Sequence, residues 1–102
     1  MMIAANDISN RVDEIQNLIA SDNIQGAVMK LMDYVRDFSE DPEYLNEVIV
    51  LSANFNKLER ELRRRTIDYE ELTRRRNELL YQMLALVDAV QNEIVVKESL
   101  AA

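Results

Sequence analysis

The chain has 102 residues, of which 48% are hydrophobic and 30% are charged, and its formal net charge at pH 7 is −7. This length fits one domain with a modest core, and the apolar content is too high for a disordered chain. One glycine, one proline and no tryptophan leave few residues for the turns of a sheet protein, so the composition predicts an all-α fold.

Cysteine and histidine are both absent from the sequence. Their absence excludes disulfides, thiolate chemistry, zinc sites built on these ligands and imidazole catalysis. The N-terminal stretch "MMIAANDISN" lacks the basic and apolar regions of a signal peptide, and the apolar runs along the chain are too short to cross a bilayer. We therefore expect a cytoplasmic protein with no cofactor, no metal and no membrane contact.

Two short helices are predicted first. One runs from about Asp7 to Ala20, where apolar residues recur on one stripe. The polar residues "SDN" at 21–23 end it, because short polar side chains tolerate the left-handed conformation and can cap the next helix. The second helix runs from about Ile24 to Phe38, with apolar spacings of three and four that are typical of an amphipathic helix.

The third helix is predicted to begin at Pro42 and to run to about Arg65. Asp41 is the expected N-cap, and proline is well suited to the first helical position because its missing N–H is not needed there. The predicted inward face of this helix consists of Leu45, Val48, Ile49, Ser52, Phe55, Leu58 and Leu62.

The segment "TID" at 66–68 is predicted to separate the third helix from the fourth. Asp68 followed by Glu71 resembles a capping box, with aspartate in the Ser/Thr position. Residues 1–90 are expected to form the helical domain, and residues 91–102 a helix extension or a frayed tail that leads toward a further effector domain. The predicted inward face of the fourth helix consists of Leu72, Leu79, Leu80, Met83, Leu84, Val87 and Val90.

The helix lengths predict how the elements pack. The third and fourth helices should each be about 35 Å long and the first two about 20 Å. A short connection makes the long pair antiparallel, so we expect a compact four-helix bundle in which two short N-terminal helices pack on a long antiparallel hairpin. Met83 is predicted to lie in the core, and Tyr34, Tyr44 and Tyr81 to lie on the buried stripes with their hydroxyls at the rim.

Charge is unevenly distributed along the chain. Residues 57–76 contain eight basic and five acidic side chains, a net charge of +3, whereas the rest of the chain carries −10. Helix physics accounts for part of the cluster, because cations in the last turn of a helix are stabilised by about 0.3–1 kcal/mol each. The spacings Glu70–Arg74 and Glu71–Arg75 also allow local ion pairs. The predicted basic surface consists of Arg60, Arg63, Arg64, Arg65, Arg74, Arg75 and Arg76.

These local effects do not explain why the acidic residues gather elsewhere. Opposite charges on two parts of one small body favour docking to a charged protein partner or to another copy of the chain. Nucleic acid is disfavoured as a partner, because phosphate binding needs a basic field that interleaved carboxylates do not cancel. The predicted acidic surface consists of Asp33, Asp37, Glu40 and Glu43.

Two other functions are compatible with the sequence. One is a structural oligomerisation bundle whose interface is apolar. The other is a small all-helical enzyme that holds an anionic substrate with arginines, as a chorismate mutase does, and this function needs arginines that point into a cavity. A metal–carboxylate bundle is excluded, because it requires Glu-x-x-His.

The segment "LSANFNKLERELRRRTIDYEELTRRRNELLYQMLALVDAV", residues 51–90, resembles the effector-associated domains of bacterial conflict systems, type eleven. The resemblance covers about residues 12–90. The glycines expected in both turns of that family are replaced here, by Asp22 or Asn23 and by the pair Arg65-Thr66. The matching pieces are Asn46-Glu47-Val48, Leu51-Ser52-Ala53, Asn56, Leu58-Glu59, Ile67–Glu71, Arg76-Asn77 and Leu84–Val90, with Ile19-Ala20 and Ala27-Val28 in register upstream.

This resemblance implies a non-catalytic adaptor similar to the death-fold adaptors. Such domains are fused to effectors such as TIR domains, caspase-like or trypsin-like proteases, or to NTPase switches, and couple them through homotypic contacts. The resemblance therefore implies a role in bacterial immunity or programmed cell death, with a like domain as the protein partner.

Overall fold

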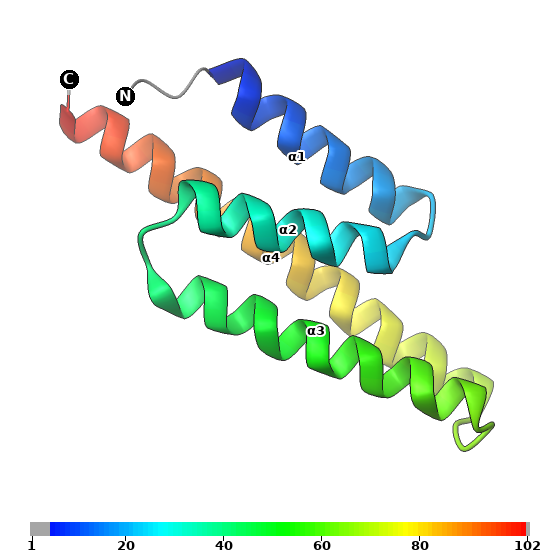
Figure 1. The fold of residues 1–102 in the computed structure, drawn as a ribbon. Helices are drawn as coiled ribbons and strands as arrows, with labels where there is room; N and C mark the ends of the chain where they lie inside the picture. The colour runs from blue at the N-terminus through cyan, green and yellow to red at the C-terminus, as the bar shows by residue number, and fades with distance from the viewer. Residues whose placement is uncertain (1–4, 102) are drawn as a thin grey trace.

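The computed structural model of the chain describes residues 5–101, with side chains for residues 7–100. It contains four helices and no strand within that range, so the predicted all-α fold is confirmed (Figure 1). The helices are α1 (Ala5–Ala20), α2 (Ile24–Phe38), α3 (Pro42–Arg63) and α4 (Tyr69–Ala101).

The four helices form a bundle built on the α3–α4 hairpin. α2 packs against both long helices, and α1 packs against α2 and α4 but makes no close backbone contact with α3 within the described chain (Figure 1). α4 has 33 residues, about 50 Å, and is longer than predicted because the helix continues past Val90 to Ala101. The molecule is accordingly elongated, with extents of 53 × 25 × 17 Å.

The predicted caps fix where three of the helices begin. Asn23, Asp41 and Asp68 each accept a hydrogen bond, at 2.8–3.0 Å, from a backbone amide two or three residues further along. Each bond satisfies an amide that the first turn of a helix leaves without a partner. The capping box is only half formed, since the Glu71 carboxylate bonds to Arg74.

The turns that follow α1 and α3 end these two helices with the same pattern of hydrogen bonds. At the end of α3 the amide of Thr66 donates to the carbonyl of Glu61 (3.0 Å), and the amide of Arg65 donates to the carbonyl of Leu62 (3.1 Å). This is a Schellman motif, which needs a residue in the left-handed region, and here Arg65 has φ = 55°. The end of α1 repeats the pattern, with Asp22 at φ = 63°.

We predict that Arg65→Gly stabilises the fold by about 1 kcal/mol, because a non-glycine residue is strained in the left-handed region. The melting temperature should rise by about 4–8 °C for a domain of this size. Thermal unfolding followed by circular dichroism measures the shift. Arg63→Gly is the matched control, since it removes the same charge from a helical position and should lower the melting temperature. Equal effects of the two substitutions would contradict the strain argument.

The core draws on all four helices, and Met83 lies fully inside it as predicted. Three residues assigned to buried stripes are exposed instead: Ile49 is 48% exposed, Leu62 41% and Tyr81 74%. Ile49 is about 100° around the helix from the fully buried Val48, so it cannot share the same stripe. Leu62 belongs to the last turn of α3. This end of the α3–α4 hairpin extends beyond α2 (Figure 1).

Tyr34 is buried as predicted, but its hydroxyl is not where it was expected. Its side chain is fully buried, and its hydroxyl does not reach the rim and finds no hydrogen-bond partner among the residues that the structure describes. The Tyr34 ring packs against the Phe38 ring, with their centroids 5.3 Å apart. The Arg11 guanidinium carbon lies over the Phe38 ring, 5.2 Å from its centroid. Burial raises the pKa of Tyr34 to about 12, although the nearby charge of Arg11 acts in the opposite direction.

A carboxylate near the end of α4 fastens the turn between α2 and α3. Glu93 accepts hydrogen bonds from the Ser39 hydroxyl (2.7 Å) and the Glu40 amide (3.1 Å). Lys97 bridges the Glu93 and Glu40 carboxylates at 3.3 and 2.8 Å. Burial raises the pKa of Glu93, but the bonds from Ser39, Glu40 and Lys97 outweigh it and leave the pKa below its ordinary value. We call the contacts of Glu93 with Ser39, Glu40 and Lys97 the Glu93 clasp.

Candidate protein interface

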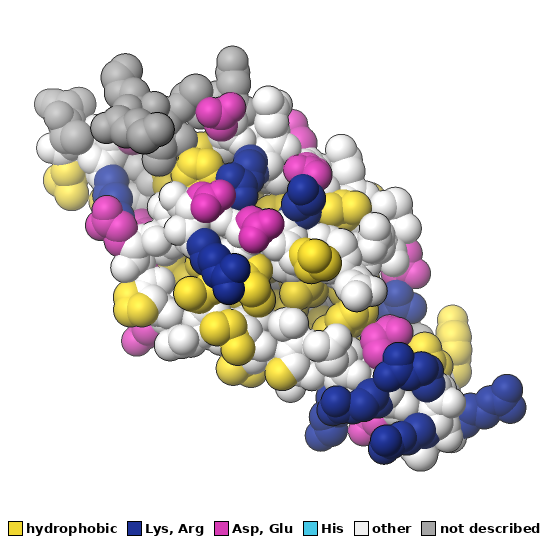
Figure 2. Space-filling model, viewed as in Figure 1, with side chains coloured by type: hydrophobic (Ala, Val, Ile, Leu, Met, Phe, Trp, Pro, Cys, Tyr) yellow, Lys and Arg dark blue, Asp and Glu magenta, His cyan; other side chains and the backbone are white. Residues whose placement is uncertain are grey.

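The tip of the α3–α4 hairpin carries all the arginines of the predicted basic surface. Arg60 and Arg63 lie at the end of α3, Arg64 and Arg65 follow directly after it, and Arg74–Arg76 lie in the first turns of α4. Figure 2 shows basic side chains gathered at this end of the molecule, beyond the region covered by α2. The Schellman turn and the Asp68 cap hold the two helix ends together there.

The arginine triplet of α4, Arg74–Arg76, is neutralised by carboxylates of the same chain. Arg74 bonds to Glu71 at 2.5 Å and to Glu78 at 2.7 Å, and the hydrogen bond and charge of Glu71, with the charge of Glu78, raise the pKa of Arg74. Arg75 pairs with Glu61 of α3, and Arg76 pairs with Asp22 at 2.6 Å. The predicted pairs Glu70–Arg74 and Glu71–Arg75 are therefore replaced by other partners.

The remaining arginines stay available to a partner. Arg60, Arg63, Arg64 and Arg65 are all exposed and make no ion pair with any residue that the structure describes. Arg60 and Arg63 lie on the last turns of α3, Arg64 is its C-cap and Arg65 lies in the turn that follows. The predicted basic surface thus divides into this open set and the paired triplet of α4.

The acidic surface divides in the same manner. Asp37 pairs with Arg11 of α1 at 2.7 Å, and Glu40 pairs with Lys97 of α4. Asp33 and Glu43 are exposed and make no ion pair among residues 7–100. Packing of α1 and of the α4 extension beside α2 brings these cations close. The charge separation seen in the sequence is therefore partly cancelled in the fold.

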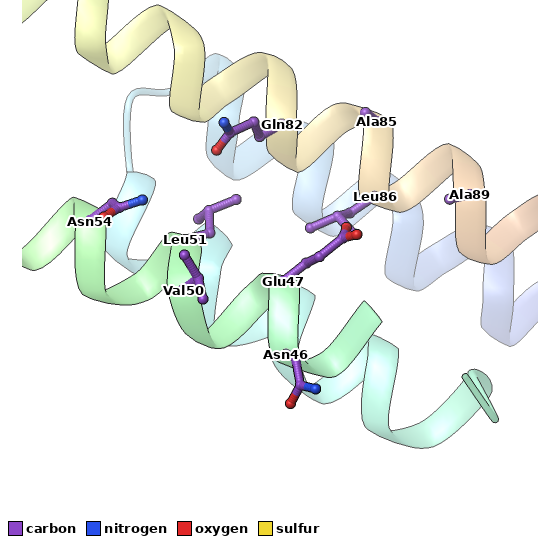
Figure 3. A pocket seen from close by; sticks show the side chains of 9 residues that line it. All are labelled: Asn46, Glu47, Val50, Leu51, Asn54, Gln82, Ala85, Leu86 and Ala89. Atoms are coloured by element: carbon purple, nitrogen blue, oxygen red, sulfur yellow. The ribbon is translucent and has the colours of Figure 1, made fainter. Parts of the chain in front are cut away.

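A groove between α3 and α4 was not predicted from the sequence. It has a volume of about 590 Å³, with Leu51 and Leu86 at its floor and Val50 on one wall (Figure 3). The signal that could have revealed it is the run "VIVL" at 48–51, because four consecutive apolar residues of a helix cannot all face one core. Val50 is accordingly 59% exposed.

The enzyme alternative requires arginines gathered around a cavity, and the cavities found among the described residues are not lined by such a set. A cavity of about 230 Å³ between α3 and α4 includes Arg75 alone among them, and Arg75 already pairs with Glu61. Over the described residues no group of three or more acidic side chains is placed to hold a metal ion.

α4 differs from the sequence expectation in one further respect. By length and composition it is the one described helix that could cross a bilayer, because a window of 18 residues within it is apolar on average and holds few charged side chains. A third of its most apolar window (33%) is buried inside the bundle. Core helices of globular bundles meet the same criterion, so this feature is only a weak indication of a membrane span.

Comparison with known proteins gives one match. The family model for effector-associated domain 11 matches residues 10–91, which include the whole hairpin tip and the groove. No curated protein and no solved structure matches the chain.

Proposed function

Because the chain belongs to the effector-associated domain 11 family, we propose that it is a non-catalytic adaptor that couples an effector or an NTPase switch of a bacterial immunity system through homotypic contacts. An adaptor-type role in effector systems follows from the family itself. The proposal adds a cytoplasmic location, the homotypic mode of contact and the surface that makes it.

The observation that carries the proposal is the set of open arginines at the hairpin tip. Among the described side chains, four guanidinium groups (Arg60, Arg63, Arg64 and Arg65) have no carboxylate partner and keep a positive field at one end, while Asp33 and Glu43 remain open toward the other. Complementary fields of this kind raise association rates and select partners more than they raise affinity. The paired triplet of α4 then serves mainly to hold the tip in shape.

One observation favours a second candidate function, an oligomerisation bundle with an apolar interface. The groove and the exposed Val50, Ile49 and Met29 provide apolar surface outside the core. Such a bundle would associate at any ionic strength, because hydrophobic burial is not weakened by screening of charge. Its response to salt therefore separates it from the proposed adaptor.

We predict that Arg64→Glu weakens self-association at least tenfold, and that raising the salt from about 50 to about 500 mM weakens the unmodified chain similarly, because the Debye length falls below 10 Å. Sedimentation velocity and light scattering over a concentration series measure both effects. Reversal of Arg63, Arg64 and Arg65 together should abolish association.

Arg36→Glu is the matched control for Arg64→Glu. Both arginines are exposed at the end of a helix, neither makes an ion pair within the described chain, and both reversals change the net charge equally. Arg36→Glu should leave association unchanged. Association that ignores both salt and the tip reversals would refute the charge-driven adaptor and support the apolar bundle.

A further inference from the structure

The exposed side of α3 carries a regular stripe. Its members recur at spacings of three and four, so they share one face of the helix. None of them contributes to the core, and all are exposed. We define the α3 stripe as Glu43, Glu47, Val50, Ala53, Lys57, Arg60 and Arg64.

Charge changes sign along this stripe. Its first third is acidic (Glu43 and Glu47), its middle is apolar and its last third is basic. The charged members make no ion pair among the residues that the structure describes. The N- and C-terminal ends of the stripe lie about 30 Å apart along a straight helix, so they cannot pair with each other inside one molecule.

Two copies of the stripe have complementary charges when they run in opposite directions, because the acidic start of one then faces the basic end of the other. If a second α3 lies antiparallel across the first, with a two-fold axis between Ala53 and Asn54, then Glu43 faces Arg64 and Glu47 faces Arg60. Two-fold symmetry repeats each pair, which gives four ion pairs in one interface. A parallel arrangement would instead place like charges opposite each other, at a cost.

The middle of the stripe fits the same arrangement. Val50 of one copy faces Lys57 of the other, whose aliphatic stem can cover the valine while the ammonium reaches water. Ala53 lies next to the axis, where a small side chain lets the helices approach closely. The apolar groove runs beside this part of α3, with Val50 on its wall, so the second copy would also cover the mouth of the groove (Figure 3).

We infer that two copies of this chain pair through the α3 stripe as a closed, antiparallel two-fold dimer. The inference rests on the proposed function and deepens it, since it names the partner surface of the arginine tip as Glu43 and Glu47 of a second copy. A two-fold interface of this kind closes on itself, so the assembly stops at two copies, whereas a head-to-tail contact between the charged ends could grow without limit.

A single cysteine tests the two-fold axis directly, because the chain has none of its own. Under mild oxidation Ala53→Cys should give a disulfide-linked dimer in high yield, since the same residue of both copies lies near the axis. Asn56→Cys is the matched control: it is exposed on the same helix, but its two copies would lie about 7.5 Å apart along the helix axis, too far for a disulfide across the interface, so it should stay largely uncrosslinked. Equal yields from the two variants would overturn the inference.

Charge exchange tests the pairing. Glu43→Lys with Glu47→Lys, and separately Arg60→Glu with Arg64→Glu, should each weaken dimerisation at least tenfold. The two double variants mixed together should form a heterodimer, and all four changes in one chain should restore the homodimer. The mass measured by light scattering should level off at two copies in every associating sample. Circular dichroism identifies any variant that has unfolded, and Val50→Lys, judged against Ile49→Lys, then replaces it.

The outcomes separate this inference from the proposed function. Salt-sensitive association that grows beyond two copies, without an Ala53→Cys crosslink, overturns the two-fold dimer and leaves the charged adaptor intact. Association that ignores salt and all charge reversals overturns both. A chain that remains monomeric at millimolar concentration overturns the dimer and restricts the adaptor to a different cognate domain.

Discussion

A chain truncated after Gln91 is expected to lose about 3–5 kcal/mol of its free energy of unfolding. The truncation removes Ile94, which is only 8% exposed, and burial of such a side chain is worth about 1.5–3 kcal/mol. It also removes Glu93 and with it the hydrogen bonds from the Ser39 hydroxyl and the Glu40 amide, each worth about 0.5–1.5 kcal/mol. This loss is a large fraction of the stability of a small domain.

Urea unfolding followed by circular dichroism measures the loss, and truncation after Ser99 is the control, because Leu100 is 83% exposed. The Glu93 contribution should depend on pH. Since the pKa of Glu93 is lower in the folded protein, its contribution is present above the unfolded pKa of about 4.3 and is lost as the pH falls through the folded value. Glu93→Gln should remove this dependence. A truncated chain as stable as the whole would show that the Glu93 clasp stabilises nothing.

Stability is also expected to fall by about 3 kcal/mol between pH 10 and about pH 12 because of Tyr34. In this range the unfolded chain ionises the phenol, while the folded chain keeps it neutral because its pKa is raised to about 12. The contribution is therefore fully present below pH 10 and disappears as the pH rises through the folded value. Urea midpoints collected across this range measure the effect.

Tyr34→Phe should abolish that part of the alkaline loss. It should also stabilise the protein at pH 7 by about 1–2 kcal/mol, because it removes a buried hydroxyl that has no hydrogen-bond partner within the described chain. Tyr81→Phe removes the same group from a side chain that is 74% exposed, and stability at pH 7 should change by less than about 0.5 kcal/mol. If Tyr34→Phe lost stability at pH 7, an unseen partner for the hydroxyl would be indicated.

The fold could be predicted from the sequence because its signals are local. Asn23, Asp41 and Asp68 cap helices by bonding to amides only two or three residues away, and these bonds fix three helix starts. The sequence predicts too short a fourth helix, because residues 91–101 become fixed only through distant partners such as Ser39. Exposure of Leu62 likewise depends on where α2 stops covering the hairpin.

The candidate site was less predictable for the same reason. The sequence identified the arginine cluster but not which of its members are neutralised. Arg75 pairs with Glu61 across the hairpin, and Arg76 pairs with Asp22, which lies 54 positions earlier. Neither contact could be predicted from the spacing of the residues in the sequence. Only the pairs of Arg74 are local, and even there the predicted partner was wrong.

The unbroken course of α4 gives it the properties of a rigid lever. From the hairpin tip to Ala101 it has no kink-forming proline or glycine, and the Glu93 clasp braces its far half. A reporter domain joined through a continuous helix at that end would be set at a defined angle to the tip. Each residue added to or removed from the junction would swing it by about 100° and shift it by about 1.5 Å, so coupling should vary with the helical phase of the junction.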